Sequence, residues 1–241
     1  MNYIKRDLES KIIYLLKEYS CLLVTGPRQV GKTTVLGRLM TDDREYVTLD
    51  DLQERSLAKN APAMFFQMHT FPILIDEVQY APQLFSYIKI AIDIGANPGD
   101  FWLTGSQAFK LMELAQESLA GRIAILHMPS LSQHEIYGNG EVLPFAVDLE
   151  QLKSRKKYNE KADIKEIYRR IWNGSMPGYV SGKFTDREVF YNSYLQTYIE
   201  RDVSELIDIK DKLQFSDFIR AAACRADAEH SRYSAGCRRV R

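Results

Sequence analysis

The sequence predicts an α/β fold in which a parallel β-sheet is flanked by helices and followed by a mainly helical, partial domain. Short, wholly apolar runs of strand length alternate with stretches of helical periodicity through the first part of the chain. This alternation is typical of βαβ units, whose parallel strands are buried on both faces. It stops near residue 140, where charged residues and then further helical patterns follow.

Five apolar runs are expected to form the strands of the sheet. They lie at residues 21–25, 46–49, 71–75, 101–104 and 123–126. Helices are expected where apolar side chains recur three and four positions apart. These stretches are 7–19, 32–40, a segment that ends at 59, 82–94, 108–119 and 186–219. Each interval between successive strands therefore holds one predicted helix, as a parallel sheet requires.

The predicted organisation has four parts. Residues 1–140 form the core, 141–165 a charged linker, 166–224 the start of an incomplete helical domain, and 225–241 a tail. The linker residues also fit an exposed helix, and their basic cluster at Lys153–Lys157 is more typical of a solvated surface than of a binding site. The tail has no apolar periodicity and is expected to be disordered.

The composition is that of an ordinary globular protein, with 241 residues of which 45% are hydrophobic and 27% charged. Lys+Arg and Asp+Glu both number 32, so the net charge is zero. This balance argues against a nucleic-acid binder that is basic all over, but not against a local basic patch. No apolar run approaches the ~20 residues of a membrane span, and the start lacks the pattern of a secretory signal. The expectation is a cytoplasmic protein without a membrane partner.

A phosphate-binding pattern follows the first predicted strand. Residues 26–33 match G-x-x-x-x-G-K-[ST], the Walker A pattern, and open a predicted helix. The glycines let the backbone wrap around phosphate oxygens, and the helix N-terminus offers unpaired N–H groups. Lys32 would reach the β- and γ-phosphates, and the Thr33 hydroxyl would ligate Mg²⁺. The alternative is a glycine-rich turn between strand and helix. The expected nucleotide-binding residues are Gly26, Pro27, Arg28, Gln29, Val30, Gly31, Lys32, Thr33 and Thr34.

Two carboxylates follow the third predicted strand, in the position of a Walker B pattern. Asp76 would hold Mg²⁺ through water, and Glu77 would orient or deprotonate the attacking water. Standing alone, these residues would more simply be two solvated acids at a strand end. Together with the loop that precedes them, they predict binding of ATP with Mg²⁺. GTP is disfavoured, because no Asn-Lys-x-Asp run follows.

Two further side chains are candidates for a catalytic role. In P-loop ATPases with an additional strand, a polar residue at the end of that strand lies between the two motifs and senses the γ-phosphate. Ser106 is the first choice for this role and Thr104 the second; alternatively, Ser106 only caps the next helix. Arg122 precedes the fifth strand, where it would face a neighbouring nucleotide or form a surface ion pair.

Seven runs of residues carry a family resemblance that covers residues 4–224. These runs are 25–33, 74–79, 103–107, 119–122, 129–132 together with Glu135, 174–179 and 198–203. With them the chain resembles a large bacterial and archaeal group of AAA-type ATPases that carry a C-terminal domain of unknown function. The resemblance implies an AAA-type P-loop core followed by the beginning of that domain, which in the family continues into a winged-helix-like region and a nuclease-like fold.

The tail departs from this resemblance. The family continues well beyond the position of Arg241, and residues 226–241 do not match it. Back-translated with permitted codons and shifted by one base, the tail reads as the family's helix-turn-helix-like continuation. We therefore expect a truncated chain with a frameshift near Arg225.

Three functions remain open on the sequence alone. The first is a Mg²⁺-dependent ATPase in which hydrolysis drives a conformational switch. The second is a switch that binds ATP but turns over little, and gates a protein partner or a second copy of the chain. The third is a DNA-associated regulator, for which the Lys153–Lys157 cluster is the available basic patch.

Overall fold

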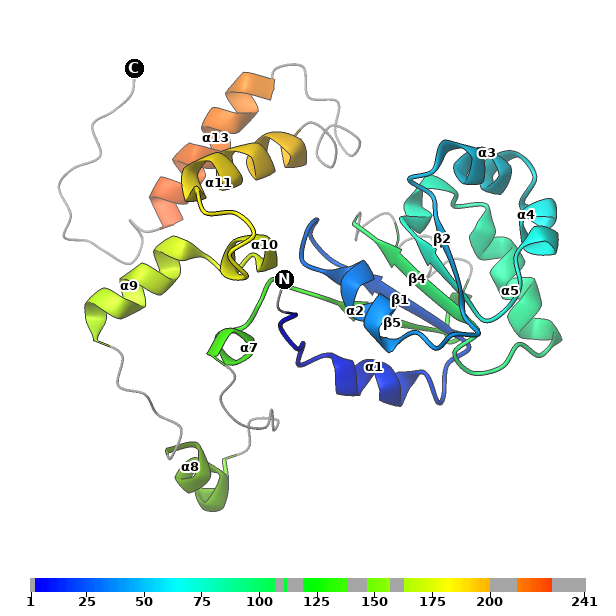
Figure 1. Ribbon diagram of the computed structural model, residues 1–241, viewed down its shortest axis with the longest axis horizontal. Coiled ribbons are helices and arrows are strands. Elements are labelled where there is room, and N and C mark those ends of the chain that lie inside the picture. The colour runs from blue at the N-terminus through cyan, green and yellow to red at the C-terminus, as the bar shows by residue number, and fades with distance from the viewer. Residues whose placement is uncertain are drawn as a thin grey trace. The chain divides into compact units, whose positions relative to one another are not determined.

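The computed structural model describes residues 3–106, 111, 119–137, 147–156, 163–199 and 212–226. Its centre is a five-stranded sheet whose strands pair in the order β2-β3-β4-β1-β5 and run parallel throughout (Figure 1). The strands are β1 (Cys21–Thr25), β2 (Glu45–Thr48), β3 (Ile73–Asp76), β4 (Phe101–Gly105) and β5 (Ile123–His127). The predicted parallel sheet flanked by helices is confirmed.

Helices connect the strands and continue after the sheet. Around the sheet they are α1 (Glu9–Leu15), α2 (Lys32–Leu39), α3 (Leu52–Asn60), α4 (Pro62–Met68), the 3-10 helix η1 (Val78–Tyr80) and α5 (Leu84–Ile94). After the sheet they are α7 (Gln133–Tyr137), α8 (Leu149–Lys156), α9 (Ile164–Asn173), α10 (Pro177–Val180), α11 (Arg187–Thr197) and α13 (Lys212–Ala226). No helix within the described ranges is long and apolar enough to cross a membrane.

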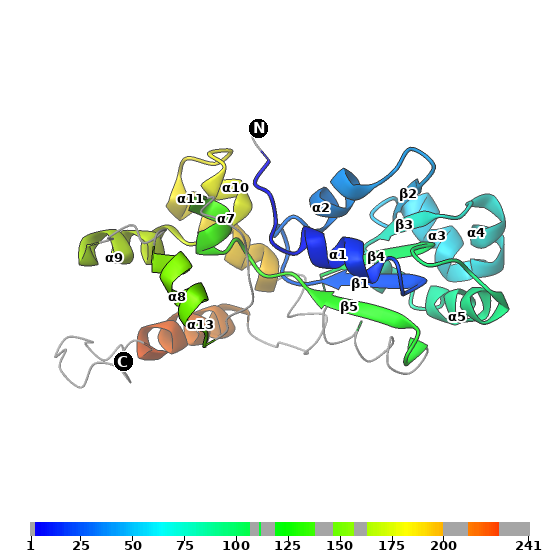
Figure 2. The ribbon, with the colours of Figure 1, turned by 90° about the horizontal axis from the view of Figure 1, so that it is seen from below.

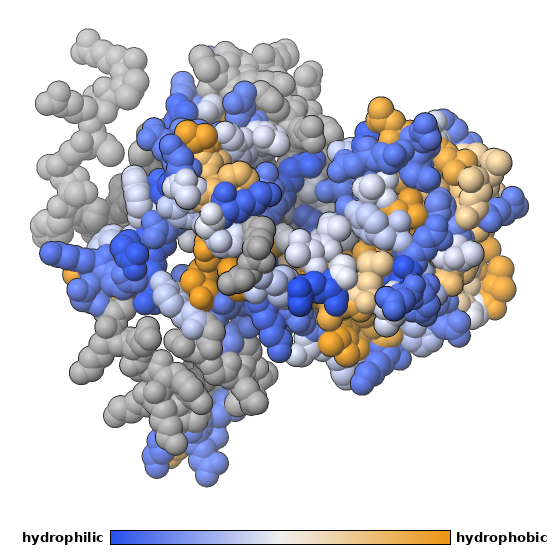
Figure 3. Space-filling view, in the orientation of Figure 1, coloured by the Kyte–Doolittle hydropathy of each residue, from blue (hydrophilic) through white to orange (hydrophobic). Residues whose placement is uncertain are grey.

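Both faces of the sheet are covered, which explains why the three central strands β1, β3 and β4 are mainly apolar and buried along their whole length. Helices α1 and α2 lie on one side and α3, α4 and α5 on the other (Figures 1 and 2). The core on the second side buries alternate strand residues against the three helices. Its fully buried members include Leu23, Ile73, Ile75, Phe101, Leu103, Phe65, Phe85 and Ile88. The molecular surface seen in Figure 3 is mostly hydrophilic, with separate apolar areas between the hydrophilic residues.

The elements differ from the sequence expectations in several places. Helix α13 ends at Ala226, beyond the expected helix end at 219 and within the first two residues of the expected tail. The expected helix over 7–19 is only α1, with turns at its end. The third strand begins at Ile73, because Pro72 has no N–H with which to join the sheet. Helix α4 follows the helix expected to end at 59 and is not among the expected elements. Pro62 occupies its first turn, where a missing N–H costs nothing.

Several expectations lie outside the described residues. Most of the helix expected over 108–119 is among them, as is the tail from residue 227 onward. Helix α8 lies within the expected linker, and α9 begins near its end. The chain divides into two compact units, Met1–Arg187 and Glu188–Arg241. The boundaries at 140, 165 and 224 remain predictions.

Candidate functional site

The sheet topology brings the sequence motifs to one edge. Strand β4 pairs with both β1 and β3, so it separates the strand before the glycine-rich loop from the strand that ends in Asp76. Because all these strands are parallel, their carboxyl ends lie at the same edge of the sheet. The loop over 26–31, the acidic pair Asp76-Glu77 and the end of β4 therefore meet at this carboxyl edge.

The loop that follows β1 has a backbone that requires glycine. Gly26 has φ 145°, and a Cβ added to it would lie 2.2 Å from the carbonyl oxygen of Met128. Gly31 has φ 93° in the left-handed region and immediately precedes α2. The first N–H groups of α2 have no partners within the helix, so they are available to an anion held in the loop.

Lys32 is folded over this loop. Its side chain is buried, with 6% of the residue exposed, and Nζ donates to the carbonyl oxygens of Gly26 at 3.0 Å and Pro27 at 2.8 Å. These are neutral acceptors, whereas a phosphate would offer the ammonium a charged one. Of the other loop residues, Pro27, Gln29 and Thr34 are exposed, and Arg28 is half-buried.

Hydroxyl groups from three elements converge on Asp76, which is 7% exposed. Thr33 of α2 donates to Oδ1 at 2.7 Å, and the hydroxyl of Thr104 from β4 donates to the same oxygen. Tyr46 of β2 donates to Oδ2 at 3.2 Å. Burial and the nearby charge of Asp76 raise the pKa of Tyr46, so its hydroxyl stays protonated and remains a donor.

The pair Thr33 and Asp76 fits a magnesium ion that is also held by phosphate. Mg²⁺ prefers oxygen ligands and is commonly bound through one or two carboxylates, several waters and substrate phosphates. The described ranges contain no group of three or more His, Cys, Asp or Glu side chains that could hold a metal by themselves. A threonine hydroxyl and one carboxylate beside a phosphate loop therefore suit a shared site rather than an all-protein cage.

Glu77 is held by its neighbours in a left-handed conformation, with φ 58°. Its N–H donates to Thr104 Oγ1 at 3.3 Å, and its carboxylate accepts a hydrogen bond from Gln79 Nε2. Gln79 is 3% exposed, and its Oε1 has no hydrogen-bond partner within the described structure. The Gln79 amide also lies 3.5 Å from Ser106 Oγ. Gln79 thus connects the candidate base to the end of β4.

The structure separates the two candidates for the γ-phosphate sensor. Thr104 is fully buried and contacts both acidic residues. Among the described residues, Ser106 contacts this cluster through Gln79. Both lie at the carboxyl edge, and the sensing role of either residue remains a prediction.

Arg122 does not join the cluster. It precedes β5, and the pairing of Cys21 with Ile123 places it at the amino edge of the sheet, opposite the loop. Its Nε pairs with Asp93 Oδ1 at 2.7 Å, and both side chains are about 40% exposed. The structure thus shows the surface ion pair that sequence reasoning held as the alternative, and any contact with a neighbouring nucleotide remains a prediction.

Sequence reasoning missed several residues at this edge. Tyr46 and Gln79 contact the two carboxylates, although no motif includes Tyr46 and only the family resemblance includes Gln79. The N-terminal segment also contributes, because Tyr3 lines a cavity of about 320 Å³ together with Gly31, Thr34 and Pro177. The guanidinium of Arg38 lies 4.4 Å from the centre of the Tyr3 ring. In the sequence, Tyr3 stands out as an aromatic residue before the first helix, but no motif connects it to the loop.

The parallel sheet, the loop and the acidic strand end together define a P-loop nucleotide-binding fold, and comparisons with known proteins agree. Residues 18–137 match a family described as the AAA domain, and residues 164–235 match a domain of unknown function, DUF8612. The chain belongs to the AAA-type P-loop ATPases and carries a C-terminal domain of unknown function.

Two curated relatives are the uncharacterized proteins Rv2008c of Mycobacterium tuberculosis and Mb2031c of Mycobacterium bovis. Each is 27% identical over 205 residues, which are 84% of this chain and 40% of the relative. The chain therefore spans about two fifths of the length of these relatives. The solved structure of a Walker-type ATPase of Pyrococcus abyssi matches with a TM-score of 0.51 and 17% identity, over 92% of this chain and 77% of that chain. At this identity the match shows a shared fold.

Proposed function

We propose that this protein binds ATP with Mg²⁺ at the carboxyl edge and hydrolyses it. The observation that carries the proposal is the 2.7 Å contact between Thr33 and Asp76, beside the buried Lys32. Thr33 and Asp76 are 43 positions apart in sequence. Folding brings their hydroxyl and carboxylate together where the loop offers its N–H groups. The triphosphate would lie in the loop, and the cavity beside Tyr3 would take the nucleoside.

Each residue of the cluster then has a defined task. Lys32 exchanges its backbone acceptors for the β- and γ-phosphates and offsets their charge. Thr33 and Asp76 hold Mg²⁺, which when bound neutralises charge that develops on the phosphate oxygens. Thr104 fixes the Asp76 carboxylate by its hydrogen bond. Glu77 orients a water molecule for attack and accepts its proton, after its carboxylate leaves Gln79.

A second candidate is an ATP-dependent switch with little turnover. The observation that favours it is the hydrogen bond from Gln79 to the Glu77 carboxylate, because a base engaged in this way is not free to orient water. In either case we propose that nucleotide state is passed to the rest of the chain as a conformational change, through the segment after β5. There, Leu131 N–H donates to the carbonyl oxygen of Ser175 at 2.9 Å.

A matched pair of substitutions at Thr33 tests the proposal. Thr33→Ser keeps the hydroxyl, whereas Thr33→Val keeps the shape and removes it. We expect Mg²⁺-dependent phosphate release from ATP to persist in the serine variant and to fall about 100-fold in the valine variant, the range for losing a charge-stabilising group. Equal release from both variants would contradict the metal site. Tight Mg·ATP binding by the wild type without measurable release would favour the low-turnover switch.

A further inference from the structure

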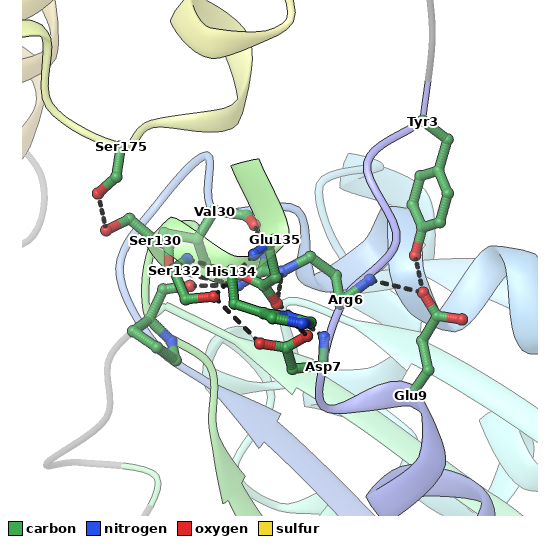
Figure 4. Close-up of polar contacts among 11 residues, drawn as sticks. Tyr3, Arg6, Asp7, Glu9, Val30, Ser130, Ser132, His134, Glu135 and Ser175 are labelled. Atoms are coloured by element: carbon green, nitrogen blue, oxygen red, sulfur yellow. Dashed lines mark hydrogen bonds and ion pairs between the residues drawn. The ribbon is translucent and has the colours of Figure 1, made fainter. Parts of the chain in front are cut away.

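A second buried polar cluster lies behind the phosphate loop and is centred on Arg6 (Figure 4). Arg6 is 4% exposed, and three of its nitrogen atoms donate to three different residues. Nε donates to Glu135 Oε1 at 2.8 Å, Nη1 to the carbonyl oxygen of Val30 at 2.7 Å, and Nη2 to the carbonyl oxygen of Pro129 at 2.8 Å. The N-terminal segment, the phosphate loop and the segment after β5 thus meet at one guanidinium group.

Glu135 completes this cluster from α7. Its side chain is 4% exposed, and both of its carboxylate oxygens are used. Oε1 accepts from Arg6 Nε and from the N–H of Asp7 at 2.8 Å, and Oε2 accepts from the N–H of Ser132 at 2.7 Å. A buried ion pair is retained without loss only when its remaining hydrogen-bonding groups are satisfied. The arrangement therefore fixes the direction of the Arg6 guanidinium.

The contact with Val30 bears on phosphate binding through the geometry of one peptide unit. In a planar trans peptide the carbonyl and the following N–H point in opposite directions. The Val30 carbonyl points toward Arg6, from which it accepts a hydrogen bond, so the N–H of Gly31 points away from Arg6. Gly31 has φ 93° and no side chain to restrain its peptide; without Arg6, this unit is free to rotate.

The other end of the loop rests on the same support. Gly26 lies against the carbonyl oxygen of Met128, and the Met128 N–H donates to the carbonyl oxygen of Thr25 at 2.7 Å. Residues 128–129 are therefore linked to both ends of the loop, directly at Gly26 and through Arg6 at Val30. The same segment also contacts the residues that precede α10, because Ser130 Oγ lies 2.7 Å from Ser175 Oγ.

We propose that Arg6 is a positioning residue for the phosphate subsite, held in place by Glu135, and that it aims the Gly31 N–H at a bound phosphate. The inference rests on the proposed function, because it assigns a task within the same site. Because Arg6 contacts both the loop and the segment 129–135, phosphate bound in the loop should also reduce the motion of that segment.

The test uses two probes, Mg·ATP and inorganic tripolyphosphate, which occupies the loop without a nucleoside. In Arg6→Lys, the ammonium can pair with Glu135 but cannot reach three partners as the guanidinium does. Affinity for both probes should fall by the same factor, about tenfold or more, as expected for one lost hydrogen bond to a charged group. A loss confined to Mg·ATP would overturn the inference, since Arg6 would then act on the nucleoside.

A matched control is Arg44→Lys. Arg44 also donates to backbone carbonyl oxygens, Gly99 at 2.8 Å among them, but it lies at the amino edge of the sheet. Its replacement should leave both affinities unchanged. If folded Arg6→Lys binds both probes as tightly as the wild type does, the inference is overturned and the proposed function stands. If the folded wild type binds neither probe, the proposed function itself fails.

A measurement on the wild type covers the case in which Arg6→Lys does not fold. Hydrogen exchange is followed at the N–H groups of Asp7 and Ser132, which donate to Glu135. Tripolyphosphate should slow their exchange about tenfold if it tightens the cluster. Unchanged exchange at saturating tripolyphosphate would overturn the proposed coupling.

Discussion

The two edges of the sheet use polar side chains in different ways. At the carboxyl edge, hydroxyl groups from three elements converge on the Asp76 carboxylate. At the amino edge, Arg44 lies 3.8 Å from the centre of the Trp102 ring and donates to backbone carbonyl oxygens that precede β4, while Arg122 pairs with Asp93. Contacts at the amino edge join neighbouring segments of the core; those at the carboxyl edge gather around a single acidic group.

Backbone strain separates the edges in the same way. Within the described ranges, the non-glycine residues with positive φ are Gln29 and Glu77, and both lie at the carboxyl edge. Such conformations cost about 1–3 kcal/mol each and persist where the surrounding structure imposes them, often at functional sites. The comparison supports the proposal that nucleotide binding belongs to the carboxyl edge. The predictions below test this difference between the edges, from the largest expected effect to the smallest.

The first prediction compares glycines at the two edges. Gly26→Ala would force a Cβ to 2.2 Å from the Met128 carbonyl oxygen, at φ 145°. We expect a loss of about 3 kcal/mol in the free energy of unfolding, from overpacking and backbone strain together. Gly121→Ala at the amino edge has φ 74° but open space around the new Cβ, and should cost about 1 kcal/mol. Urea denaturation measures the free energy of unfolding of both variants. Equal losses would show that the contact between Gly26 and Met128 does not make Gly26 more sensitive than Gly121.

The second prediction concerns turnover at the carboxyl edge. Glu77→Gln keeps the shape of the side chain and removes its capacity to accept a proton. Phosphate release from ATP should fall by about 100-fold or more, the usual contribution of a general base, while affinity for Mg·ATP stays within about twofold. Calorimetry and a phosphate-release assay on the same samples check this. Equal turnover in the two proteins would show that Glu77 is not the base.

The third prediction concerns the exposed ion pair at the amino edge. Arg122→Ala removes its contact with Asp93, and both side chains are about 40% exposed. Exposed pairs contribute little, so the free energy of unfolding should change by less than about 1 kcal/mol. A larger loss in urea denaturation would mean that this edge depends on ionic contacts more than its exposure indicates.

The smallest effect is a pH dependence of stability that arises away from the carboxyl edge. His69 hydrogen-bonds Glu45 at 2.7 Å and Glu54 at 3.0 Å. Burial disfavours its charged form, but the contacts with the two carboxylates outweigh burial and raise the pKa of His69. Its contribution is therefore fully present below the unfolded pKa of about 6.5 and lost as the pH rises through the higher folded value.

The His69→Gln variant isolates this contribution. The wild type should lose stability relative to the variant between about pH 6 and pH 8.5, as measured by urea denaturation at both values. A difference between the two proteins that does not change with pH would show that folding does not raise the pKa of His69.

Much of the fold could be predicted because strands β1, β3 and β4 are buried on both faces, which makes them mainly apolar runs in the sequence. The meeting of the loop with Asp76 and Glu77 was also predictable, because parallel strands end at a common edge. The contact between Arg6 and Glu135 was not, since it joins residues 129 positions apart. Likewise, the choice between Thr104 and Ser106 depends on which side chain faces Asp76, and the sequence does not show that β4 continues through Gly105.

The most direct test of the account is Mg·ATP binding by calorimetry, with Lys32→Ala as the matched variant. The Lys32 Nζ donates to two carbonyl oxygens of its own loop. We expect the Lys32→Ala variant to keep its fold, which circular dichroism would check. We expect the wild type to bind Mg·ATP and the variant to lose affinity about 100-fold, consistent with removal of a buried charge that faces phosphate. Equal affinity in the two folded proteins would contradict the assignment of the carboxyl edge as the nucleotide site.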